Sequence, residues 1–304
     1  MFGKIVVNDK EASKGIDNVT RTAKQSEGIM SSSFKKIGAA VAGAFSVAAM
    51  VGFEKSVIET YTTFDDQMRK VQAVSGATGD AVTALRDKAK ELGSTTRFSA
   101  TEAGEGMEAL ARAGWETEDV INEVGNVLAF ATANSIDLGA AAELVSDGLN
   151  QFGLEAKDTQ YFTDVLSQTA ANSSTDVLGL KESLINTSGM VKVFGYDLED
   201  VSVALGLMGD EALKGGAAGT SLNSAFMHMA KGGKDVNKAM KDLGISLYDA
   251  NGNAKPLDTV LRDLRTSFGK LSDEQKAQYS STLFGTAGMK GMMAIIETSD
   301  EDFN

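Results

Sequence analysis

The chain has 304 residues, of which 42% are hydrophobic and 23% charged, so it can bury a core and is neither disordered nor fibrous. It has no Cys and one His, which excludes disulfide scaffolds, Cys-ligated zinc, thiol catalysis and most His-based metal or acid–base sites. The net charge of −13 opposes non-specific binding to nucleic acid, and we expect no sequence-specific nucleic-acid partner.

The first 36 residues differ in charge from the rest of the chain. They carry 7 basic and 4 acidic side chains, whereas residues 37–304 carry 22 and 38. We expect a basic N-terminal arm over residues 1–36, with one short strand at Phe2–Val7. The first apolar run begins only at Ile37, too late for a secretory signal, so we expect synthesis in the cytoplasm.

Residues 37–53 contain no charged side chain. As a helix they would span about 25 Å, slightly less than the ~30 Å hydrocarbon layer of a membrane. Most are small, which suits close packing of helices in water or in lipid. The segment is therefore a candidate for membrane insertion or for helix packing through its larger apolar residues, which are Ile37, Val41, Phe45, Val47, Met50, Val51 and Phe53.

The same helix is predicted to continue to residue 75 with an apolar residue every three or four positions. This heptad-like spacing indicates either a short coiled coil or an amphipathic helix packed on the body of the protein. We treat it as a candidate seam for self-association, formed by Val57, Tyr61, Phe64, Met68 and Val71.

From residue 80 to about 244 the sequence predicts short helices separated by Gly and opened by Ser, Thr or Asp. Ser99 with Glu102 forms a capping-box pattern. Turns after Gly114, Gly153 and Gly195 share one pattern of Gly, a large apolar residue, three mostly polar residues and Asp. A repeat of about 40 residues predicts an array of helix hairpins that bury their apolar faces against their neighbours.

The last part of the chain changes character. Residues 213–221 are Gly-rich and indicate a flexible hinge or a close helix contact, and residues 245–257 alternate around Asn251-Gly252, which predicts a small β-hairpin. We expect an all-α fold: a Gly-punctuated helix-hairpin array with that hairpin and a long N-terminal helix. The expected domains are residues 1–36, 37–75 and 76–304, and the uncapped end at Asn304 suggests a piece of a longer protein.

No pattern of catalytic, cofactor-binding or metal-ligating residues is convincing. The Asp249, Asn251 and Asn253 spacing resembles the start of a calcium loop, but Ala254 and Val260 stand where such a loop needs Gly and Glu. His228 has no partner carboxylate that the sequence identifies. We therefore expect a protein without cofactor, metal or enzymatic activity.

Four segments together resemble the core region of phage tail tape measure proteins. In chain order they are residues 98–115 (FSATEAGEGMEALARAGW), 215–222 (GGAAGTSL), 244–261 (GISLYDANGNAKPLDTVL) and 283–289 (LFGTAGM). The resemblance implies a structural protein of the tail lumen, made in the host cytoplasm, that sets tail length during assembly and leaves through the tube at genome delivery.

The same resemblance implies particular partners: the tail tube protein, tail assembly chaperones, the tail tip or baseplate complex and other copies of the chain. It also leaves open that residues 37–53 enter the host membrane at genome delivery. An alternative from a different class is a pore-forming helical protein that inserts the same residues.

Overall fold

The computed structural model describes the backbone of residues 47–303, and side chains are described from Thr60 to Phe303 except at Asp300 and Asp302. The chain divides into two units, Met1–Thr62 and Thr63–Asn304. The predicted arm at 1–36 and the strand at Phe2–Val7 lie outside the described residues. All regular elements of the described part are helices: α3 (Val47–Ser75), α4 (Asp80–Thr95), α5 (Ala100–Arg112), α6 (Thr117–Ala133), α7 (Leu138–Phe152), η1 (Ala156–Asp158), α8 (Thr159–Ala171), α9 (Val177–Phe194), α10 (Leu198–Asp210), α11 (Gly216–Lys231), α12 (Lys234–Leu243), α13 (Leu257–Phe268), α14 (Asp273–Glu297) and α15 (Asp300–Phe303).

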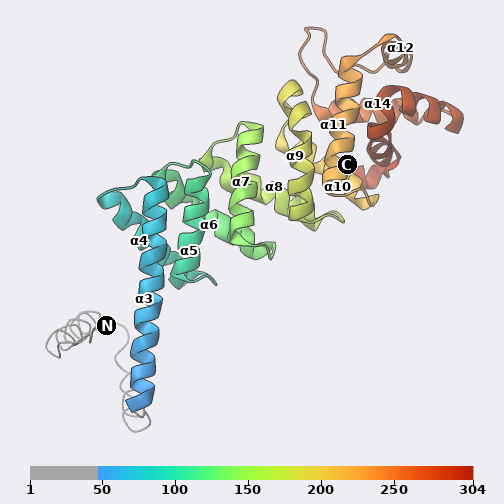
Figure 1. Ribbon diagram of the computed structural model, residues 1–304. Helices are drawn as coiled ribbons and strands as arrows, with labels where there is room; N and C mark the ends of the chain where they lie inside the picture. Colours follow the sequence, from blue (N-terminus) through green and yellow to red (C-terminus); the bar gives the residue numbers. More distant parts are fainter. Residues whose placement is uncertain (1–46, 304) are drawn as a thin grey trace, which may run out of the picture. The chain divides into compact units, whose positions relative to one another are not determined.

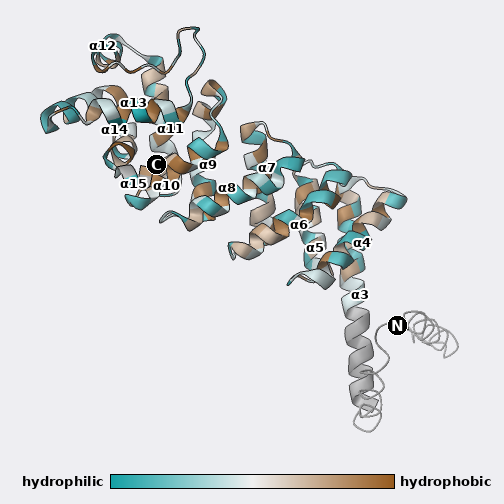
Figure 2. Ribbon diagram, turned by 180° about the vertical axis from the view of Figure 1, so that it is seen from behind, coloured by the Kyte–Doolittle hydropathy of each residue, from teal (hydrophilic) through white to brown (hydrophobic). Residues whose placement is uncertain are grey.

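Helices α4 to α11 of the second unit form two rows. One row runs α5, α7, α9, α11, and each member contacts the next; the other runs α4, α6, α8, α10 in the same way (Figure 1). Consecutive helices cross from one row to the other. Hydrophobic and hydrophilic residues alternate around the helices, as expected for amphipathic helices that pack on two sides (Figure 2). The predicted helix-hairpin array is therefore present.

Local sequence signals explain where these helices start and stop. The Ser99 hydroxyl accepts the N–H of Glu102, and the Glu102 carboxylate accepts the N–H of Ser99, which completes the predicted capping box of α5. Gly114, Gly153 and Gly195 have φ values of 89°, 67° and 69°, a left-handed conformation that Gly adopts without a steric penalty. The repeated turns thus end one helix and lead into the next.

The Gly-rich segment before α11 is a close helix contact. Gly216 already belongs to α11, and α11 packs along α9. A Cβ at Gly219 would lie 1.9 Å from the backbone oxygen of Ser183. The Ser183 hydroxyl also donates to the Gly215 carbonyl at 2.8 Å. Of the two interpretations of this segment, the structure favours close packing over a flexible hinge.

The predicted β-hairpin at about 245–257 is wrong. Residues 47–303 contain no strand, and their sole β pairing is an isolated antiparallel bridge between Tyr248 and Ala254. The side chain of Asp249 accepts the N–H of Asn253 at 2.9 Å and so replaces a ladder bond inside the turn. Pro256 has no N–H to extend the pairing, and α13 begins at the next residue.

Helix α14 is broken in the middle. Gly285 has φ 65° and ψ 177°, outside the helical region. The ring Nε2 of His228, on α11, lies 3.2 Å from the carbonyl oxygen of Thr282. Because a break of this kind frees carbonyl groups of the preceding turn, we assign Nε2 as the donor to Thr282. His228 thus has a structural partner across the α11–α14 contact.

Candidate functional site

The candidate membrane segment falls mostly outside the described residues. This applies to Ile37, Val41 and Phe45; the backbone at Val47, Met50, Val51 and Phe53 is helical within α3, and their side chains lie outside the described part. Among the described residues, no helix combines the length and apolar character needed to cross a bilayer. Membrane insertion or helix packing by this segment stays a prediction.

The candidate self-association seam is partly used inside the chain. Phe64, Met68 and Val71 are 7%, 1% and 0% exposed, whereas Tyr61 is 68% exposed. The backbone at Val57 is helical, and its side chain lies outside the described part. The buried residues belong to the core of the second unit, so any self-association through this seam would depend on its N-terminal end.

The buried end of the seam packs on α5. A Cβ at Gly104 would lie 3.0 Å from the Gln67 side chain and 3.3 Å from the sulfur of Met68, so the two helices approach closely there. Gln67 Nε2 donates to Glu108 Oε2 at 2.7 Å beside this contact. The spacing that indicated a coiled coil is thus satisfied by an intramolecular helix pair.

Polar side chains join neighbouring hairpins of the array at a recurring distance along the chain. Asn134 Nδ2 donates to Ser167 Oγ at 3.0 Å, and the amide of Gln151 donates to the Leu184 carbonyl at 2.9 Å. Both pairs are 33 residues apart in sequence. These contacts were not recognisable in the sequence, because nothing in an isolated Asn or Gln identifies its partner. The predicted repeat indicated only the approximate number of residues between two contacting positions.

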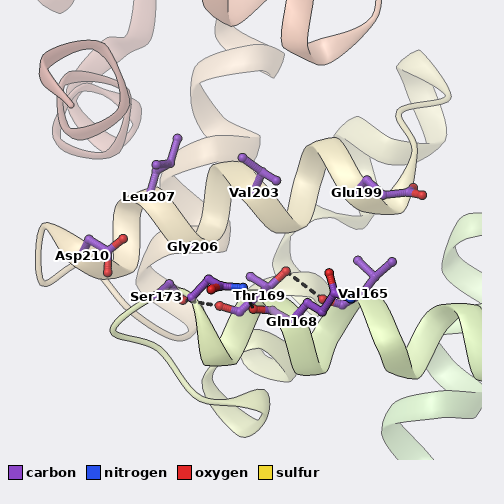
Figure 3. A pocket seen from close by; sticks show the side chains of 10 residues that line it. Val165, Gln168, Thr169, Ser173, Glu199, Val203, Gly206, Leu207 and Asp210 are labelled. Carbon is purple, nitrogen blue, oxygen red and sulfur yellow. Dashed lines mark hydrogen bonds between the residues drawn. The ribbon is translucent and has the colours of Figure 1, made fainter. Parts of the chain in front are cut away.

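A groove of about 360 Å³ lies between α8 and α10. Figure 3 shows Val165, Gln168 and Thr169 following one another along α8 and Ser173 just beyond its end, with Gly206 on the facing helix. A Cβ at Gly206 would lie 3.3 Å from the Thr169 methyl group, so the missing side chain allows the two helices to approach. The lining combines apolar side chains such as Val203 and Leu207 with the amides of Gln168 and Asn172.

Carboxylates stand at the two ends of this groove, at Glu199 and Asp210. Both already accept hydrogen bonds: Tyr161 donates its hydroxyl to Glu199, and the backbone N–H of Ser174 donates to Asp210 Oδ1 at 2.6 Å. Burial and the neighbouring Glu199 raise the pKa of Tyr161 above its ordinary value. This tyrosine therefore stays protonated and donates its hydroxyl to Glu199.

Asp200 connects the array to α13. Its carboxylate accepts the N–H of Asp258 at 3.0 Å, and burial, opposed by that bond, raises the pKa of Asp200. Among the described residues there is no group of three or more His, Asp or Glu side chains arranged to hold a metal ion. Asp200 is explained by its role in fixing the start of α13.

Comparison with known proteins agrees with the resemblance drawn from the four segments. Residues 86–285 match the family model described as phage-related minor tail protein. The chain is 34% identical over 252 residues to the tape measure protein of Pneumococcus phage Dp-1, covering 83% of this chain and 22% of that protein. It is 28% identical over 253 residues to the probable tape measure protein of Escherichia phage P2, covering 82% of this chain and 31% of the relative.

The chain thus spans less than a third of the length of both relatives. No solved structure matches it. The resemblance to tape measure proteins is confirmed, and the chain belongs to the family of phage-related minor tail proteins.

Proposed function

We propose that this chain is the folded core of a tape measure protein, a structural component of the tail lumen that sets tail length. The observation that carries the proposal is the similarity of over four fifths of the chain to two proteins named as tape measures. Its partners in this role are the tail tube protein, the assembly chaperones, the tail tip or baseplate complex and further copies of itself. After assembly it leaves through the tube at genome delivery.

The architecture is compatible with such a role. Successive hairpins contact mainly their neighbours, so the array can open one hairpin at a time, which suits a chain that must pass through a narrow tube. Entry of residues 37–53 into the host membrane, and the alternative of a pore-forming protein, remain predictions that rest on the sequence of that segment alone.

The role as a ruler is tested by changing the length of the gene product in its phage. A helical residue adds about 1.5 Å, so inserting a helical segment of about 100 residues after Asn304 should lengthen the tails by about 150 Å. An insertion of equal length made of Gly and Ser serves as the control. Electron microscopy of the virions gives tail length, and tails of unchanged length with the helical insertion present would contradict the proposal.

A further inference from the structure

Helix α9 carries large apolar side chains on its exposed side as well as on its buried side. Leu178, Ile185 and Val193 are 43%, 53% and 55% exposed. They are seven and eight residues apart, close to two helical turns each, so they lie along one side of the helix. A surface helix normally presents polar residues on the side opposite the core, and these three residues, which we call the α9 stripe, depart from that pattern.

The neighbours of α9 in the array leave the α9 stripe open. Helix α9 packs against α7 and α11 within its row and contacts α8 and α10 of the other row. The side that packs into the core holds Leu180, Leu184 and Met190, which are at most 2% exposed. The α9 stripe lies on the opposite side. Covering exposed aliphatic side chains is favourable, and grouped exposed apolar residues mark surfaces that bind other proteins.

The surface beside Leu178 is hollowed. One open cleft of about 480 Å³ is lined by Leu178 and Glu182 of α9 and by Lys214 and Gly215 just before α11. The Lys214 ammonium group donates to the carbonyl oxygen of Ser174 at the edge of this cleft. A second cleft, of about 620 Å³, also reaches Leu178 and lies between the C-terminal ends of α6 and α8. Leu178 therefore stands beside room for an apolar side chain of another helix.

Two opposite charges flank the middle of the α9 stripe. Glu182 and Lys192 are exposed, and in the described part of the chain neither forms an ion pair. Lys181 differs, because it pairs with Glu143 of α7 at 2.5 Å. If two α9 helices packed in parallel, like charges would face each other. An antiparallel pair instead brings Glu182 of each copy near Lys192 of the other, so the charges are complementary in that orientation.

We propose that the α9 stripe joins two copies of this chain, with their α9 helices packed antiparallel about a two-fold axis near Ile185. Along the helix Leu178 lies about 10 Å before Ile185 and Val193 about 12 Å after it. Leu178 of each copy therefore meets Val193 of the other, which enters the cleft beside it, and Ile185 meets its own symmetry mate. Both copies use the same surface, as in an isologous interface. This contact rests on the proposed function, which names further copies as partners, and specifies how they meet.

Disulfide cross-linking of the full chain tests the register, because the chain has no Cys of its own. Ile185→Cys should form a covalent dimer on mild oxidation, since the two-fold axis brings the two introduced sulfurs together. Val203→Cys is the matched control, because Val203 is 51% exposed but lies on α10, outside the stripe. We expect Ile185→Cys to cross-link at least about tenfold faster at micromolar concentration. Equal rates for the two variants would overturn the proposal.

Exchange of the two charges tests the antiparallel pairing by sedimentation equilibrium. Glu182→Lys and Lys192→Glu should each weaken the dimer about tenfold, because each places like charges opposite one another. The double variant should regain the affinity of the wild type, since opposite charges face each other again. Glu105→Lys, an equal charge change at an exposed position of α5, is the control and should leave the affinity unchanged.

A double variant no tighter than the single variants would refute the pairing, and so would a wild-type chain that stays monomeric at about 100 μM. Circular dichroism before each run confirms equal helix content. Tail length does not enter these measurements. A negative result therefore removes this interface and leaves the role as a ruler to the test on virions.

Discussion

At the scale of single residues, glycine decides how closely the helices approach. Gly219 lies against the backbone of α9, where a Cβ would meet the Ser183 oxygen at 1.9 Å, and a Cβ at Gly148 would meet the Phe162 ring at 2.0 Å. Backbone atoms cannot move aside as a flexible side chain does. Small residues at these positions are therefore a packing requirement of the fold.

We expect Gly219→Ala to lower the free energy of unfolding by about 3 kcal/mol, because α9 and α11 must separate to admit the methyl group. The matched control is Gly125→Ala in α6, where a Cβ would make only an ordinary contact of 3.7 Å with Leu92. This control should raise stability by about 0.5 to 1 kcal/mol through helix propensity. Urea denaturation measures both, and equal stability of the two variants would refute the close-contact explanation.

At the scale of elements, capping residues set the helix boundaries. The box at the start of α5 matters because hydrogen bonds from the Ser99 backbone and hydroxyl lower the pKa of Glu102 below its ordinary value near 4.5. The ionised Glu102 carboxylate therefore stabilises the fold at pH values above about 4.5, its ordinary pKa. Its contribution is lost as the pH falls through the lower pKa of the folded state.

Ser99→Ala should cost about 1 kcal/mol of stability at neutral pH, because α5 loses its cap. Glu102→Gln retains an acceptor for the Ser99 N–H but no longer titrates, so its stability should fall less than that of the wild type between about pH 5 and pH 3. Thermal unfolding across this range provides the measurement. Ser188→Ala, on the exposed face of α9, should change little, and a parallel acid response of Glu102→Gln and wild type would exclude the capping role.

At the scale of the whole molecule, the array depends on contacts between neighbouring hairpins. Residues of α3 from Phe64 onward complete the first of these contacts by covering α5, which explains why this seam is buried. Its role in self-association is a proposal that concerns the exposed end at Tyr61. The two functions of the seam can be separated by mutation.

Phe64→Asp should lower the free energy of unfolding by at least about 3 kcal/mol, because it places a charge in the core. Tyr61→Asp should leave unfolding unchanged within about 0.5 kcal/mol and reduce association if the seam joins copies. Sedimentation velocity reports the oligomeric state and denaturation reports the stability. If Tyr61→Asp left the oligomeric state unchanged, this end of the seam would not be part of an interface between copies.

The sequence by itself determined that the fold is all-α, where several of its helices start or stop, and the family. These features depend on local rules: a left-handed Gly such as Gly153 ends a helix wherever it folds, and the Ser99 and Glu102 pair caps a helix using groups three residues apart. The family followed from four ordered segments, which are also local in the chain.

Only the tertiary structure decided which apolar faces are covered and which distant side chains meet. Heptad spacing is the same whether Met68 packs on another copy or on α5. Alternation around Gly252 predicts strands even where the Asp249 side chain accepts the Asn253 N–H in place of a backbone carbonyl. The groove between α8 and α10 brings together Thr169 and Gly206, which are 37 positions apart. Such meetings depend on how the rows of helices pack, which no short stretch of sequence specifies.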